Sequence, residues 1–162
     1  MRRVLDNPSG GERIVIRDSR PAVLEFDVFL QPGAHVPAGH THPRQEERFD
    51  VVAGRVRFRV GRRELVAGPG AHLCVPCGTR HWFGNVGEDV AHVRVSVRPA
   101  LRMEALLETT TRSSTLPLVQ RLLGLALIPW DFPHELGVPY VPAWLLSAAL
   151  RPLALLRGAL AR

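Results

Sequence analysis

The sequence contains no lysine, and all 21 of its basic residues are arginine. It is also poor in aromatic residues, which make up 6% of its 162 residues. The formal net charge of +6 would suit an anionic partner such as a nucleic acid. However, the arginines are spread along the chain, with few aromatic side chains between them to stack on bases, so we expect no nucleic-acid partner. The excess of arginine accompanies many Ala, Gly, Pro, Val and Leu residues, which indicates a coding bias.

Cysteine is scarce as well. The two cysteines, Cys74 and Cys77, are spaced as C-x-x-C, but a redox pair of this kind usually opens a helix after a strand. Pro76 and Gly78 flank Cys77 and indicate a turn that leaves a strand. A structural zinc site needs about four ligands, and the sequence has no second cysteine pair. We therefore expect two ordinary thiols in a reducing compartment.

Several other features are missing. No apolar stretch follows the arginines near the N-terminus, so we expect no signal peptide and a cytoplasmic protein. No internal repeat is apparent, and no helix-turn-helix segment is recognisable, which argues against a transcriptional regulator. Hydrophobic residues nevertheless make up 46% of the chain, which is enough for one core in a chain of single-domain length.

Residues 14–98 are predicted to form many short strands, divided by Gly and Pro turns. In residues 23–30 and 91–97, one face of the predicted strand is apolar, which is typical of a strand buried on at least one side. Short strands at fairly even spacing indicate a sandwich or a barrel. We therefore predict an all-β domain over residues 1–99.

Three histidines and one glutamate carry the main chemical signal. His40 and His42 are two residues apart, and on a strand such residues share a face, so both rings can reach one ion. Glu47 can return across a hairpin to supply a carboxylate, and His81 follows a later turn. Three imidazoles and one carboxylate suit Fe, Mn, Ni, Cu, Co or Zn, and they leave room for water or substrate.

The spacing of these residues resembles the two motifs of the cupin superfamily. Residues 40–54 read H-x-H, four residues, E, six residues, G, and residues 70–85 read G-x5-P-x-G-x2-H-x3-N. The resemblance covers residues 23–98 and implies a small single-domain cupin, a jelly-roll β-barrel with a metal in its mouth. It implies that the ligands of one divalent transition metal are His40, His42, Glu47 and His81. Gly33 lies one residue further back than the first motif usually has its glycine.

Two neighbouring residues leave alternatives open. Glu46 would replace Glu47 as the ligand if the hairpin register slipped by one residue, although alternation sends Glu46 to the opposite face. His35 is a candidate general base or a support for a ligand, but a histidine in a surface loop is the favoured interpretation.

The fold alone does not determine the function. A complete ligand set favours a metal-dependent enzyme that acts on a small organic substrate. We expect dioxygenase-like oxygenation at an open metal site, because this reaction is common among small cupins with this motif. The alternatives are Lewis-acid cyclisation or isomerisation, and a non-catalytic cupin that binds a small molecule. The resemblance also implies a homodimer, because small cupins often pair through their sheets.

Residues 100–162 have no counterpart in the cupin motifs and are predicted to form a helical C-terminal extension. Within it, residues 116–128 and 143–161 are apolar with few charges. Arg151 and Pro152 disfavour a transmembrane helix. The favoured interpretation is that the helices pack on the barrel or on a partner subunit, with residues 130–142 as a loop near the pocket mouth.

The alternative for this extension is a contact with the membrane surface through residues 143–162, which would make the protein peripheral at the membrane. In that arrangement Trp144 and the leucines would enter the lipid, and the arginines would face anionic headgroups. All four predicted ligands precede the extension, so the sequence predicts that a chain ending at Arg98 or near Thr111 is less stable but still binds metal.

Overall fold

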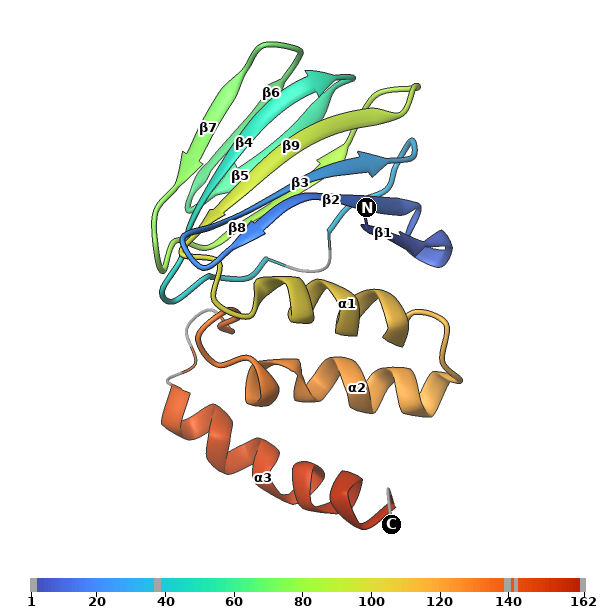
Figure 1. The fold of residues 1–162 in the computed structure, drawn as a ribbon, viewed down its shortest axis with the longest axis vertical. Helices are drawn as coiled ribbons and strands as arrows, with labels where there is room; N and C mark the ends of the chain where they lie inside the picture. Colours follow the sequence, from blue (N-terminus) through green and yellow to red (C-terminus); the bar gives the residue numbers. More distant parts are fainter. Residues whose placement is uncertain (1–2, 37–38, 139–140, 142, 161–162) are drawn as a thin grey trace.

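A computed structural model describes residues 3–36, 39–138, 141 and 143–160. A region of β-strands is followed by helices at one end of the molecule (Figure 1). The strands are β1 (Arg3–Asn7), β2 (Glu12–Arg20), β3 (Val23–Leu30), β4 (Glu46–Ala53), β5 (Val56–Val60), β6 (Arg63–Ala67), β7 (His72–Val75), β8 (His81–Asn85) and β9 (Ala91–Arg98). The helices are α1 (Met103–Ser113), α2 (Leu118–Asp131) and α3 (Ala143–Leu160).

The strands form two sheets. The six-stranded sheet has the order β1-β2-β3-β9-β4-β7, and the three-stranded sheet has the order β6-β5-β8. Strand β9 inserts between β3 and β4 and pairs antiparallel with both. The fold is a jelly roll with C-terminal helices, as predicted, although in the described part of the chain the strand pairing does not close into one ring.

The core lies between the sheets and follows from strict alternation along β3 and β9. Every second residue of β9, from Ala91 to Val97, is fully buried. The alternate residues of β3, from Leu24 to Leu30, lie directly opposite them. Because β3 and β9 are neighbours in one sheet, this alternation gives the six-stranded sheet one apolar face. Burial of that face against apolar residues of the three-stranded sheet, such as Val56 and Phe58, holds the two sheets together.

The helices extend this core rather than forming a separate one. Met103 and Leu106 of α1 are buried in the same cluster as the strand residues, and Ile128 of α2 and Phe132 after it join them. Helix α2 continues to Asp131. The predicted loop over residues 130–142 is therefore wrong for its first two residues, which are helical. The prediction also missed β1, because the polar sequence of residues 3–7 gave no apolar alternation.

Helix α3 is the outermost element. It packs against α2 and lies at the end of the molecule away from the sheets (Figure 1). In the described part of the chain, no helix has the length and apolar character needed to cross a membrane.

Candidate metal centre

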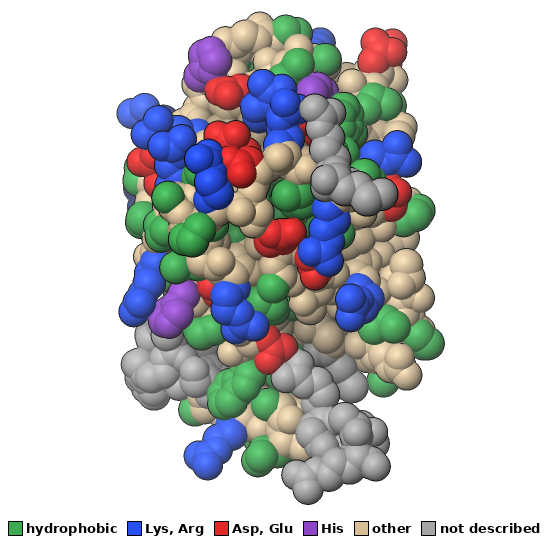
Figure 2. Space-filling model, in the orientation of Figure 1, with side chains coloured by type: hydrophobic (Ala, Val, Ile, Leu, Met, Phe, Trp, Pro, Cys, Tyr) green, Lys and Arg blue, Asp and Glu red, His purple; other side chains and the backbone are tan. Residues whose placement is uncertain are grey.

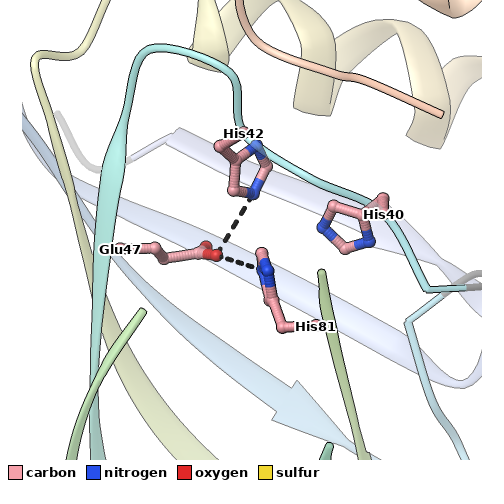
Figure 3. Close-up of side chains that lie close together, drawn as sticks. All are labelled: His40, His42, Glu47 and His81. Carbon is pink, nitrogen blue, oxygen red and sulfur yellow. Dashed lines mark hydrogen bonds and ion pairs between the residues drawn. The ribbon is translucent and has the colours of Figure 1, made fainter. Parts of the chain in front are cut away.

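The four residues singled out in the sequence come together in the structure (Figure 3). Each offers one ligand atom, and all of these atoms lie within 4.8 Å of one another. The imidazole ring centroids of His40 and His81 are 4.6 Å apart, and those of His42 and His81 are 5.1 Å apart. His42, Glu47 and His81 are buried, whereas His40 is partly exposed.

His40 reaches the site from an extended segment rather than from a regular strand. Its backbone exchanges two hydrogen bonds with His81: the His40 N–H donates to the His81 carbonyl at 3.1 Å, and the His81 N–H donates back at 2.9 Å. The predicted hairpin between this segment and Glu47 is therefore wrong. Glu47 belongs to β4, which pairs with β7 and β9 in the six-stranded sheet, while His40 and His81 meet along the three-stranded sheet.

The turn before β8 fixes His42 as well as His81. Gly78 has a φ of +72°, in the left-handed region that glycine adopts without strain. Its N–H donates to the His42 carbonyl at 2.8 Å. The turn that positions His81 thus also holds the backbone of the first ligand segment.

Glu47 faces the histidines, and Glu46 does not. The Glu47 Oε2 atom lies 2.8 Å from His81 Nε2 and 3.2 Å from His42 Nε2. Glu46 lies on the opposite face of β4, where its carboxylate accepts a hydrogen bond from Arg48 at 2.7 Å. Glu47 is therefore the carboxylate beside the imidazoles, in the register favoured from the sequence.

Backbone carbonyls orient two of the imidazoles. His42 Nδ1 lies 2.5 Å from the Glu135 carbonyl oxygen, and His81 Nδ1 lies 3.0 Å from the Thr79 carbonyl oxygen. A carbonyl can only accept, so each Nδ1 carries the proton and donates it. Each ring then turns its Nε2 towards Glu47. A support of this kind fixes the tautomer of metal-binding histidines in proteins.

The Glu47 carboxylate and the His42 imidazole each stabilise the charged form of the other. Burial alone would raise the pKa of Glu47, but the charge and hydrogen bonds of His42 and His81 lower it far below its ordinary range. Burial alone would lower the pKa of His42, but the Glu47 carboxylate and the Glu135 carbonyl raise it. A cation therefore belongs between these groups, either as protons on the rings or as a metal ion. The donor set of three imidazoles and one carboxylate fits a divalent transition metal.

Aromatic side chains lie beside the centre on its inner side. Phe49 and Phe83 have ring centroids 5.1 Å apart, and the Phe49 ring lies 6.1 Å from that of His81. Phe58 completes the cluster. The inner side of the centre is therefore apolar, and its partly exposed member is His40.

His35 lies outside the four-residue centre. Its side chain is exposed, its Nδ1 is 2.9 Å from the carbonyl of its neighbour Val36, and its backbone bridges to Gly84. This placement agrees with the favoured interpretation of a surface histidine, while its candidate role as a base stays a prediction.

Residues 130–142 were predicted to lie near the pocket mouth, and residues 135–137 do lie along the segment that carries His40 and His42. The Thr41 N–H donates to the Gly137 carbonyl at 3.2 Å, and the Gly137 N–H donates back to Thr41 at 2.9 Å. A Cβ atom on Gly137 would meet Thr41 Oγ1 at 2.5 Å, which explains the glycine. Glu135 is buried, and its side chain accepts from the Arg102 N–H at 3.0 Å. This stretch, the 135–137 segment, therefore lies along the ligand segment and carries the carbonyl that orients His42.

Comparison with known proteins places this geometry in context. Residues 26–97 match the family described as Cupin domain. This match contains all four residues of the centre and ends before the helices. No curated protein matches the chain.

Several solved structures share the fold. The structure of KdgF from Halomonas sp. has a TM-score of 0.52 and 22% identity, and the match covers 55% of this chain and 79% of that one. A sugar phosphate isomerase from a cupin superfamily, from Silicibacter pomeroyi, has a TM-score of 0.51 and 24% identity, covering 54% and 59%. A recombinant oxalate oxidase in complex with glycolate has a TM-score of 0.50 and 24% identity, covering 56% and 52%. At these identities the likeness concerns the fold.

Proposed function

We propose that this protein, whose residues 26–97 match the Cupin domain family, is a metal-dependent enzyme acting on a small organic substrate by dioxygenase-like oxygenation. The observation that carries the proposal is the centre itself. Three imidazoles and one carboxylate, all within 4.8 Å, converge at the end of a buried aromatic cluster. A merely structural role would not require a partly exposed ligand, whereas catalysis requires access for a substrate.

Each residue of the centre has a distinct part in this proposal. His40, His42, His81 and Glu47 would hold the ion, and Glu47 would balance part of its charge. When bound, a divalent metal supplies Lewis acidity and, for iron, manganese or copper, redox chemistry with O2. The Thr79 and Glu135 carbonyls hold His81 and His42 in the tautomer that presents Nε2. Phe49 and Phe83 exclude water from the inner side.

The substrate would approach from the side of His40. His40 is the partly exposed member of the set, while the other three are buried. The exposed edge of the centre is therefore the place where a small molecule can meet the ion. The fold accommodates more than one chemistry, since an oxalate oxidase and a sugar phosphate isomerase share it.

Metal content and O2 consumption together test the proposal. The purified protein is analysed for metals, then stripped and reloaded separately with Fe, Mn, Ni, Cu, Co and Zn. Each form is offered flavonols, diketones and thiols while dissolved O2 is followed. We expect consumption with a redox-active metal and none in the His81→Ala variant.

Three outcomes would contradict oxygenation. Turnover by the zinc form without O2 uptake would favour Lewis-acid cyclisation or isomerisation. Ligand capture that survives both metal removal and His81→Ala, without turnover, would favour a binding protein. No turnover with any metal would remove oxygenation as the proposed reaction.

A further inference from the structure

The outward side of helix α3 is apolar. Apart from Arg151, the side chains that α3 exposes among those described are Leu145, Ala148, Ala149, Pro152 and Leu155. Their spacing of three and four residues places them along one stripe of the helix. We call this stripe the α3 face. A surface helix normally turns an apolar stripe towards the core, whereas the α3 face is turned towards solvent together with Arg151.

Helix α2 adds to the exposed apolar surface. Leu118 and Val119 in its first turn are 68% and 69% exposed, and Leu122 follows one turn later. Helices α2 and α3 pack together and run in opposite directions (Figure 1). The first turns of α2 and the last turns of α3 therefore lie at the same end of the pair. Exposed apolar side chains grouped on one side of a helix pair indicate an interaction site.

The charged residues of the segment that contains α3 are of one sign. Residues 136–162 contain three arginines and no Asp or Glu, and Arg151 is exposed beside the α3 face. The lowest part of Figure 2, which corresponds to the region of α3 in Figure 1, shows hydrophobic and arginine side chains among the grey residues. A partner for this surface must therefore be apolar and negatively charged.

We propose that α3, together with the first turns of α2, docks this protein onto the surface of an anionic membrane. Acidic lipid headgroups supply the charge that the arginines lack, and the acyl region receives the leucines. A second copy of the chain fits less well, because two-fold pairing of α3 would oppose arginine to arginine with no carboxylate in residues 136–162. The helix lies along the membrane surface, since it is not apolar and long enough to span it.

Vesicle co-sedimentation tests this proposal with the full-length protein. The vesicles are phosphatidylcholine alone or phosphatidylcholine mixed with phosphatidylglycerol. We expect binding to the anionic vesicles at low salt and its loss at about 0.5 M salt, where the arginine charges are screened. Arg151→Glu weakens binding by about fivefold or more, the factor expected for losing one basic residue near the surface. The double variant Leu145→Glu/Leu155→Glu weakens it by about tenfold or more, because two apolar anchors become charged.

Leu65→Glu is the matched control. Leu65 is also exposed, at 39%, but it lies on β6, at the end of the molecule away from the helices (Figure 1). The Leu65→Glu variant should bind anionic vesicles as strongly as the unchanged protein does. All substituted side chains are exposed, so thermal midpoints should stay the same. If the double variant unfolds, the vesicle binding of Arg151→Glu and its dependence on salt still test the proposal.

Other results would overturn the proposal. The proposal is wrong if the protein does not bind anionic vesicles at low salt, or if it binds uncharged vesicles equally well. It is also wrong if Leu65→Glu weakens vesicle binding as much as the α3 variants do. Light scattering provides a further test. If the double variant converts a dimer into a monomer, the α3 face belongs to a second copy of the chain.

Discussion

His42 donates its Nδ1 proton to the backbone carbonyl of Glu135, 93 positions further along the chain. This hydrogen bond joins a residue of the first cupin motif to the helical extension that follows the matched domain. The extension is therefore part of the candidate metal centre, although it contributes none of the four side chains.

Truncation tests this connection. A chain ending at Ser114 keeps all four predicted ligands but loses the Glu135 carbonyl, so we expect its metal affinity to fall by about 10-fold to 100-fold, as when a support of a ligand is removed. The sequence alone predicted retained binding, and the structure changes that expectation to weaker binding. A chain ending at Val138 keeps the 135–137 segment and should bind like the full chain. Competition with a chromogenic chelator measures both, and equal affinities would contradict the link.

A single substitution tests the same link without truncation. In Gly137→Ala, the new Cβ would lie 2.5 Å from Thr41 Oγ1 and 3.2 Å from Pro43 Cγ, so either these side chains or the 135–137 segment must shift. We expect weaker metal binding and a lower thermal midpoint. Gly68→Ala is the control, because a Cβ there meets nothing within 4 Å. The same chelator competition, applied to both variants, should separate them.

The two adjacent glutamates should differ sharply. Glu47→Gln removes the carboxylate that lies 2.8 Å from His81 Nε2, and we expect metal affinity to drop by about 100-fold or more because a charged ligand is replaced by a neutral one. Glu46→Gln alters a carboxylate on the opposite face of β4, where it pairs with Arg48, so its metal content should match that of the unchanged protein. Elemental analysis after dialysis provides the readout. A comparable loss in Glu46→Gln would show that the register is wrong.

The folded state of the metal-free protein should be most stable over a limited pH range. The pKa of Glu47 is lowered from 4.5, so its contribution is present above that value and is lost as the pH falls. The pKa of His42 is raised from 6.5, so its contribution is present below that value and is lost as the pH rises through the raised pKa. Stability to urea should therefore be highest between these limits. Glu47→Gln should flatten both slopes, and unchanged slopes in that variant would contradict the assignment.

The charged cluster around Asp27 should affect the stability of the fold but not metal binding. Asp27 is buried on the outer face of β3, where it accepts hydrogen bonds from Arg17 at 2.7 Å and Arg94 at 3.2 Å. Although burial opposes it, contact with Arg17, His92 and Arg94 lowers the pKa of Asp27. Asp27→Asn should destabilise the fold by about 2 kcal/mol, since the arginines are partly exposed and lose only part of their compensation. Asp50→Asn, in an exposed pair with His72, should change the free energy of unfolding by less than about 0.5 kcal/mol.

Some features could be predicted from the sequence because they depend on local patterns. The alternation in residues 91–97 indicates one buried face, and the spacing around His40, Glu47 and His81 indicates one centre. Strand β1 could not be predicted in this way, because its exposed edge position needs no apolar alternation. The loop over residues 130–142 was predicted near the pocket mouth, but the contact of the Glu135 carbonyl with His42 was not, because a backbone carbonyl makes no demand on residue type. The hairpin to Glu47 was predicted from chain proximity, whereas the jelly roll pairs β4 with the distant β9.

The division of the centre between two sheets has a practical consequence. Glu47 belongs to the six-stranded sheet and His81 to the three-stranded one, so an ion held by both is a cross-link between the two halves of the core. Such a ligand stabilises the folded state in proportion to how tightly it binds, by RT ln(1 + [L]/Kd). The rise in melting temperature that each metal ion causes therefore reports how tightly the protein binds that ion. A thermal-shift titration with each ion can rank the metals before any substrate is known.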